Sequence, residues 1–98
     1  MRFNEKVLNL CKKIPKGKVT TYKIIAQKLN SRAYRAVGNA LNKNKKPLIV
    51  PCHRVVSSDG SLGGYSKGVK EKTRLLKREG IKVRDNKIIN FKERLYRL

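Results

Sequence analysis

The chain has 98 residues, with 26 Lys or Arg against 6 Asp or Glu and a formal net charge of +20. A chain of this length forms one domain, and its 39% hydrophobic content supports a modest core. It has no apolar run of the roughly 18 residues that a membrane span needs, and no N-terminal signal pattern. Two cysteines are too few for a disulfide scaffold, and with the one histidine they fall short of a four-ligand zinc site. We therefore expect a single intracellular domain, cytoplasmic or, in a eukaryote, nuclear, without a metal or a cofactor.

The positive charge is distributed unevenly along the chain. No acidic residue lies between Glu5 and Asp59, a stretch that contains Lys6, Lys12, Lys13, Lys16, Lys18, Lys23, Lys28, Arg32, Arg35, Lys43, Lys45, Lys46 and Arg54. Such self-repulsion destabilises a compact fold unless a polyanion is nearby. A solvated lysine-rich surface is the alternative, and an anionic membrane is disfavoured because no basic segment carries a wide apolar face. The charge therefore predicts a nucleic-acid partner.

The first segment predicts an amphipathic helix with Asn4 as a possible N-cap. Its apolar residues recur at helical spacing: Phe3, Val7, Leu8, Leu10, Cys11 and Ile14. Cys11 lies on this apolar side and is expected to be a small buried hydrophobe. The sequence Pro15-Lys16-Gly17 then ends the helix.

Two further helical patterns follow in close succession. The first is capped by Thr20 or Thr21 and has the apolar positions Tyr22, Ile25, Ala26 and Leu29. The residues Asn30-Ser31 interrupt it, and a second stripe begins at once with Ala33, Ala36, Val37, Ala40 and Leu41. Two short helices joined by a tight polar turn predict a helix-turn-helix, although an ordinary helical hairpin shows the same periodicity.

The polar face of the second of these helices is expected to meet nucleic acid. Arg32, Arg35 and Asn39 follow the spacing i, i+3, i+7 on the face away from the apolar stripe. Ala36 and Gly38, with Ala33, make this helix thin, which permits close approach to a ligand or to another helix.

The second half of the chain predicts smaller elements. An apolar run, residues 47–56, is bounded by prolines and is expected to be a short buried segment that ends near Cys52 and His53. A turn at 57–60, a glycine-rich loop at 63–66 and a helix from Val69 to a Gly80 cap follow. A small hairpin over 81–89 and a helical tail with Phe91, Leu95 and Leu98 complete the chain. The expected fold class is mainly α, winged-helix-like or helix-turn-helix, with a small β element in a single domain, 1–98.

Cys52 is the residue that draws attention as a nucleophile. A thiol beside His53 and Arg54 has electropositive surroundings, which favour the thiolate. A structural cysteine at the end of a buried segment is the alternative. A papain-like pair is disfavoured, because its histidine comes from a distant part of the chain. The base for Cys52 is therefore His53, a water, or a distant carboxylate, for which the candidates are Asp59, Glu71 and Glu79.

The motif around this cysteine resembles a known family. Pro51-Cys52-His53-Arg54-Val55 is the PCHRV signature of the O6-alkylguanine-DNA alkyltransferases. Other segments agree with the family in order and spacing, namely Val19-Thr20-Thr21-Tyr22, Arg35-Ala36-Val37-Gly38, Asn44, Pro47, Gly64-Tyr65-Ser66 and Glu79-Gly80. The resemblance runs from about Phe3 to Ile81. The N-terminal domain usual in the family is expected to be absent.

The resemblance implies a DNA-repair mechanism in which the alkylated guanine is flipped out of the duplex. Arg35 matches the arginine that fills the gap in the base stack, although a plain phosphate contact is the simpler interpretation. Ala36 and Gly38 would let the helix enter the minor groove, and Leu41 would help to support the widened groove.

The resemblance also implies roles at the reacting atoms. Cys52 would attack the alkyl carbon and keep the alkyl group, while His53 deprotonates it through a water and Glu79 orients the histidine. Tyr22 would serve N3 of the leaving base, and the Ser66 backbone N–H would meet O6. The remaining substrate contacts would be the carbonyls of Cys52 and Val55, the hinge residue Asn44, and the pocket walls Pro47 and Tyr65.

The leading hypothesis is thus a single-turnover methyltransferase that binds double-stranded DNA as a monomer. The first alternative is a non-catalytic alkyltransferase-like protein that flips and marks O6-alkylguanine; relatives of that kind typically lack the cysteine. The second is a general DNA-coating protein, which would explain the charge but not the spacing of Cys52, His53, Tyr22 and Glu79.

Overall fold

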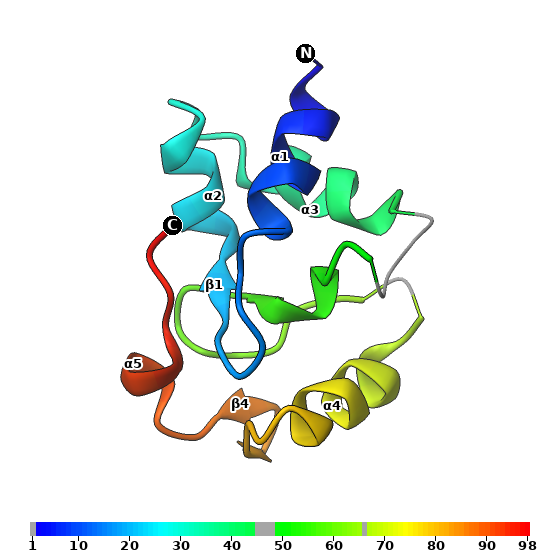
Figure 1. Ribbon diagram of the computed structural model, residues 1–98, viewed down its shortest axis with the longest axis vertical. Coiled ribbons are helices and arrows are strands. Elements are labelled where there is room, and N and C mark those ends of the chain that lie inside the picture. The colour runs from blue at the N-terminus through cyan, green and yellow to red at the C-terminus, as the bar shows by residue number, and fades with distance from the viewer. Residues whose placement is uncertain (1, 45–48, 66) are drawn as a thin grey trace.

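A computed structural model of the protein describes residues 2–44, 49–65 and 67–98. Its elements in chain order are α1 (Phe3–Cys11), β1 (Thr20–Thr21), α2 (Tyr22–Lys28), α3 (Tyr34–Asn42), the 3-10 helix η1 (Cys52–Arg54), β2 (Val55–Val56), α4 (Val69–Arg78), β3 (Val83–Arg84), β4 (Lys87–Ile88) and α5 (Phe91–Arg94). Helices α1, α2 and α3 gather at one end, and α4 and the β3–β4 hairpin lie at the other (Figure 1). This arrangement confirms the mainly α fold class with a small β element.

A two-residue parallel strand pair joins the two ends of the molecule. Thr20 pairs with Val55 and Thr21 with Val56, so β1 and β2 form a sheet across more than thirty residues of sequence. Successive residues of a strand point to opposite faces. Val55 therefore packs into one hydrophobic core and Val56 into a second.

The two cores lie on either side of this sheet. The first holds the three N-terminal helices together and contains Val7, Cys11, Ile14, Ile25, Ala26, Val37, Ala40, Leu41, Val50, Cys52 and Val55. The second lies under α4 and the hairpin and contains Val19, Val56, Leu62, Leu76, Ile81 and Ile88. Cys11 is fully buried, which confirms its prediction as a core residue.

The structure confirms the helix-turn-helix and corrects where its second helix begins. The side chain of Thr21 caps α2 by accepting from Ile24 N at 3.0 Å. Ser31 Oγ accepts from Ala33 N at 3.0 Å, a local bond that keeps these residues out of a helix. Helix α3 starts only at Tyr34, so Arg32 precedes it and is not on its polar face.

Two further predictions are corrected by the structure. The first is the cap of α1: Asn4 does not cap this helix, because the helix already begins at Phe3 after Arg2, whose side chain makes no capping bond. Ile49, at 66% exposed, departs from the buried segment expected over 47–56, whereas Val50 and Cys52 are buried. In the described part of the chain, no helix combines the length and hydrophobicity that crossing a bilayer requires.

The C-terminal third confirms the capped helix and the hairpin but not the helical tail. Gly80 follows α4 in the left-handed conformation, with φ +85°. Gly80 N donates to Lys77 O at 3.0 Å and Ile81 N donates to Leu76 O at 3.0 Å, which is the hydrogen-bond pattern of a Schellman motif. Strands β3 and β4 pair in antiparallel register around Asp85 and Asn86, both left-handed.

The predicted tail helix is wrong beyond one turn. Helix α5 spans Phe91–Arg94 only, and Leu95 is extended. The reason is that the backbone of the tail pairs with Val19, the residue just before β1. Val19 N donates to Arg94 O at 2.9 Å, and Tyr96 N donates to Val19 O at 2.7 Å. These bonds require an extended chain, which a continued helix could not supply.

The left-handed cap of α4 yields a stability prediction. Gly80→Ala is expected to lower the free energy of unfolding by about 1–2 kcal/mol, because a Cβ is strained at positive φ even though space around it is open. Gly38→Ala is the matched control, since Gly38 lies inside α3 with equally open space, and it is expected to stabilise by up to about 1 kcal/mol. Denaturant unfolding of both variants measures the difference, and equal effects would contradict the assignment of the cap.

Candidate active site

A cavity of about 400 Å³ opens between the helix-turn-helix and the glycine-rich loop. Its lining residues come from α2, α3, η1 and the loop after β2: Tyr22, Tyr34, Arg35, Gly38, Asn39, Leu41, Asn42, Cys52, Ser57, Gly63, Gly64 and Tyr65. Cys52 is 4% exposed and lines this cavity. A ligand that reaches the thiol through this cavity must therefore be small enough to enter it.

The β1–β2 pairing explains why the cavity exists. Tyr22 follows β1 directly as the first residue of α2, and Cys52 precedes β2 by only the length of η1. Pairing of Thr20 with Val55 therefore brings the tyrosine and the thiol to the same side of the molecule. The short helix η1 is closed by Arg54 N donating to Pro51 O at 2.9 Å. Cys52 lines the cavity, whereas the next residue, His53, does not.

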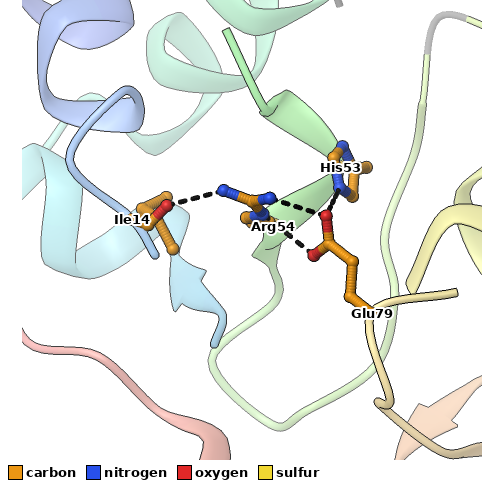
Figure 2. Close-up of polar contacts among 4 residues, drawn as sticks. All are labelled: Ile14, His53, Arg54 and Glu79. Atoms are coloured by element: carbon orange, nitrogen blue, oxygen red, sulfur yellow. Dashed lines mark hydrogen bonds and ion pairs between the residues drawn. The ribbon is translucent and has the colours of Figure 1, made fainter. Parts of the chain in front are cut away.

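The two residues that follow Cys52 in the chain, His53 and Arg54, form a hydrogen-bonded network with Glu79 (Figure 2). His53 Nε2 lies 3.0 Å from Glu79 Oε2. The Arg54 guanidinium holds the same carboxylate with Nε at 2.9 Å and a terminal nitrogen at 2.6 Å. Its other terminal nitrogen donates to Ile14 O at 2.8 Å, which ties the network to the chain after α1. Arg54, expected to act on Cys52 itself, is directed to Glu79.

The network sets the protonation of the histidine. Burial lowers the pKa of His53 below its usual value and outweighs the opposing hydrogen bond and charge of Glu79. For Glu79, burial acts to raise the pKa, but hydrogen bonds from Arg54 and His53 prevail and lower it. A neutral imidazole thus donates from Nε2 to an ionised carboxylate. Its Nδ1, which is buried without a hydrogen-bond partner among the described residues, is left as an acceptor for a proton.

Two tyrosines present hydroxyl groups near the thiol. Burial raises the pKa of Tyr22, and the electrostatic effect of the neighbouring Cys52 raises it further. The same two causes raise the pKa of Tyr65 to about 12. Both phenols therefore keep their protons at neutral pH and can act as donors. Among the described residues, Tyr22 OH makes one long hydrogen bond, to Gly64 O at 3.5 Å. Gly63, at φ +70°, lets the loop pass this ring, since a Cβ there would lie 3.0 Å from the Tyr22 hydroxyl.

The substrate-binding residues predicted from the sequence are placed in part. Asn44 Nδ2 donates to Val50 O at 2.9 Å and so links the end of α3 to the segment before Cys52. Val55 is fully buried in β2, and its carbonyl oxygen accepts a bond from Lys72. Tyr65 lines the cavity. Pro47 and Ser66 lie outside the residues that the structure describes.

The predicted DNA-binding residues divide into three groups. Arg35, Gly38 and Asn39 lie on α3 and line the cavity. Leu41 also lines it, but at 5% exposed it belongs to the first core, so its role in a groove stays a prediction. Ala36 is half-buried on α3 outside the lining, and Arg32 is exposed before the helix.

Two residues of the site were missed by the sequence reasoning. Tyr34, 43% exposed, lines the cavity at the start of α3, and only its place beside Arg35 could have indicated it. Lys72 is fully buried on α4, with its ammonium near the Tyr22 ring. Its position in the apolar stripe of the predicted helix, with Val69 and Leu76, was an available signal. Over residues 2–44, 49–65 and 67–98, no three His, Cys, Asp or Glu side chains gather as a metal site would need.

The fold and the site together define a small helix-turn-helix domain with a buried cysteine beside a histidine–carboxylate pair. The family model described as "6-O-methylguanine DNA methyltransferase, DNA binding domain" matches residues 2–81. The chain therefore belongs to the 6-O-methylguanine DNA methyltransferase family, as the PCHRV motif predicted.

Known proteins support this assignment. The methylated-DNA–protein-cysteine methyltransferase of Methanocaldococcus vulcanius is 54% identical over 82 residues, which cover 84% of this chain and 50% of that protein. The crystal structure of the O6-methylguanine-DNA methyltransferase from Pyrococcus kodakaraensis is similar with a TM-score of 0.75 and 45% identity over 83% of this chain and 47% of that chain. Atl1 of S. pombe, solved in complex with damaged DNA containing O6-carboxymethylguanine, has a TM-score of 0.86 and 30% identity, with both chains covered completely. The chain spans about half the length of the curated relatives it matches.

The lowered pKa of His53 predicts acid sensitivity. Because the unfolded chain binds a proton at this histidine more readily than the folded protein, its contribution to stability is present above its usual pKa of 6.5 and is lost as the pH falls below it. We expect the free energy of unfolding to decrease from pH 6.5 toward pH 5. His53→Gln removes this titration and should flatten the curve in that window. An unchanged slope in the variant would contradict the prediction.

Proposed function

We propose that the protein repairs O6-alkylguanine in double-stranded DNA by transferring the alkyl group to Cys52 in a single turnover. The observation that carries this proposal is the buried Cys52 at a cavity, next to a neutral His53 that is hydrogen-bonded to Glu79. A DNA-modifying thiol acts inside the cell, in agreement with its need for a reduced cysteine. The protein acts as a monomer, and neither a metal nor a cofactor takes part.

The proposed chemistry is an in-line displacement at the alkyl carbon. His53 Nδ1 takes the thiol proton through a water, and Cys52 Sγ attacks as the bond between the alkyl carbon and O6 breaks. The bonding electrons go to the guanine, which gains a proton at N3 from Tyr22. Tyr22 then regains a proton from water and His53 releases one to water, so that the net reaction moves one proton from the thiol to the guanine. Because the thioether is stable, each molecule reacts once.

The proposed DNA contacts follow from the position of α3. The guanine enters the cavity after rotating out of the duplex, because its O6 substituent cannot meet a buried thiol while stacked. Arg35, on the cavity rim, occupies the gap in the stack, and the small residues Ala36 and Gly38 permit α3 to lie in the minor groove with Asn39. The Ser66 N–H and the carbonyls of Cys52 and Val55 select guanine, while Pro47 and Tyr65 border the alkyl group.

A second candidate function is favoured by one comparison. Atl1 of S. pombe matches this chain over the full length of both proteins. Under this alternative, the protein flips O6-alkylguanine and marks it without transfer. Cys52, followed in the chain by a neutral His53 that can accept a proton, favours transfer, because a protein that only marks the lesion does not need a nucleophile.

Mass spectrometry after incubation with an O6-methylguanine duplex tests the proposal. We expect one added methyl group on the peptide that contains Cys52 and none on the peptide with Cys11, whose pKa burial raises to about 12. Cys52→Ser should abolish the adduct and retain DNA binding, and Cys11→Ser is the control that should still react. Lesion-selective binding without an adduct would favour the alternative, and binding without lesion preference would contradict both.

The role of Arg35 yields a second prediction. Arg35→Ala should slow transfer on duplex DNA about tenfold or more, because the vacated stack is left unfilled, while affinity for undamaged duplex falls only by the loss of about one phosphate-type contact. Arg84→Ala is the control of equal charge loss, since Arg84 lies on β3, which pairs with β4. Strand β4 lies at the opposite end of the molecule from α3 (Figure 1). Single-turnover rates and salt dependence of binding separate the two effects. Equal transfer rates in the two variants would show that Arg35 supplies only charge.

A further inference from the structure

Lys72 carries a charge in the interior of the protein, and neither the packing of the fold nor the proposed reaction explains it. It is 0% exposed on α4. Its ammonium donates to Val55 O at 2.7 Å, to Leu62 O and to Gly64 O at 3.0 Å, which uses all three of its protons. Within the described residues no carboxylate forms an ion pair with it. The three bonds satisfy the ammonium but leave its charge uncompensated.

Such burial is costly and demands a reason. Taking a cation out of water without a counter-ion disfavours the charged form, and burial lowers the pKa of Lys72 to about 8. A methionine or leucine on α4 could fill the same volume in the core without this cost. Packing alone therefore does not explain a lysine here.

The three acceptors belong to the segments that build the cavity. Val55 begins β2 directly after η1, and Gly64 belongs to the loop that lines the cavity together with Tyr65. Gly64 O is also the acceptor of the long bond from Tyr22 OH. Because Lys72 already satisfies that carbonyl, the Tyr22 hydroxyl can turn to a bound base without leaving a buried acceptor unpaired. The ammonium also lies 5.8 Å from the centre of the Tyr22 ring.

In the proposed reaction, negative charge develops near the ammonium of Lys72. Negative charge is carried first by the Cys52 sulfur and then by the departing guanine, and both are held by the cavity that the Lys72 acceptors frame. A fixed cation in a low-dielectric interior stabilises such charge without reorganisation. It also helps to keep His53 neutral, since its charge opposes protonation of the imidazole.

We propose that Lys72 is a positioning residue for alkyl transfer, which ties the cavity loop to β2, frees the Tyr22 hydroxyl and supplies the buried counter-charge for the anionic reaction centre. The inference rests on the proposed function. It differs from the relay of His53 and Glu79 because Lys72 exchanges no proton with the substrate. It therefore predicts an effect on the transfer rate that is separate from an effect on DNA binding.

The test is a single-turnover measurement with the O6-methylguanine duplex in excess. Lys72→Met removes the charge and keeps the length of the side chain, and Lys77→Met is the control, an exposed lysine on the same helix with the same charge loss. We expect Lys72→Met to lower the first-order transfer rate constant about tenfold or more, while both variants bind undamaged duplex equally. Equal transfer rate constants in the two variants would overturn the proposal.

A pH profile separates this role from a purely structural one. The titratable groups facing Lys72 are Cys52 and His53 of η1, Cys11 of α1 and Tyr22 of α2. As the pH rises through about 8, the wild-type lysine loses its proton, and we expect the transfer rate constant to decline between about pH 7 and pH 9.5. Lys72→Arg keeps its charge over this range, so the ratio of wild-type to Lys72→Arg rate constants should fall several-fold.

These measurements decide the question even if a variant does not fold, which circular dichroism would show. With Lys72→Met unfolded, a constant ratio of wild-type to Lys72→Arg overturns the proposal. If both variants are unfolded, the wild-type protein alone decides: a transfer rate constant that does not decline above pH 8 overturns the proposal. Failure of the proposed function is a different result, since wild-type protein would then carry no methyl group on Cys52.

Discussion

The parallel pairing of Thr20–Thr21 with Val55–Val56 is the constraint on which the rest of the molecule depends. Each strand has only two residues, so few backbone hydrogen bonds are involved, but they are fully buried between two cores. The pairing brings the first residue of α2 against the segment that contains the cysteine, and it orients Val55 and Val56 into separate cores. Together with the first core and the bond from Asn44 to Val50 O, it joins the helix-turn-helix to the segment that carries the thiol.

Charge is organised differently outside and inside the protein. Most of the 26 basic residues are exposed, where they attract a polyanion without regard to sequence. Inside, two basic side chains are placed individually. Arg54 neutralises Glu79 and so keeps this carboxylate available to His53, whereas Lys72 has only carbonyl partners among the described residues. The first arrangement is an ion pair, whereas in the second the positive charge has no counter-ion among the described residues.

The chain after Ile81, which the family match does not include, is tied to the rest of the fold by side chains and backbone together. Arg94 donates to Gly17 O at 3.2 Å and to Gly80 O at 3.1 Å, joining the loop before β1 to the end of α4. Backbone pairing of Val19 with Leu95 extends this connection. The tail thus reinforces the strand that places Tyr22, although its contacts lie away from Cys52.

Local chemistry made much of this protein predictable from its sequence. Helical periodicity and the Thr21 cap located the helix-turn-helix, Gly80 marked the end of α4, and Asp85-Asn86 marked the hairpin, because caps and turns depend on residues that are neighbours in the chain. The PCHRV motif identified the family. The tail was mispredicted because it depends on a distant contact: it is extended where it pairs with Val19. The start of α3 was also mispredicted, although the Ser31 bond that delays the helix is local.

The sequence by itself thus determined most of the helices and the family, since each is encoded by residues close together in the chain. Only the tertiary structure decided that Arg54 holds Glu79 rather than facing the thiol, that Tyr34 reaches the cavity, and that Lys72 lies buried beneath it. A lysine in a helical stripe looks alike whether its ammonium reaches water or is buried. The difference is made by the carbonyls of Val55, Leu62 and Gly64, which only folding brings around α4.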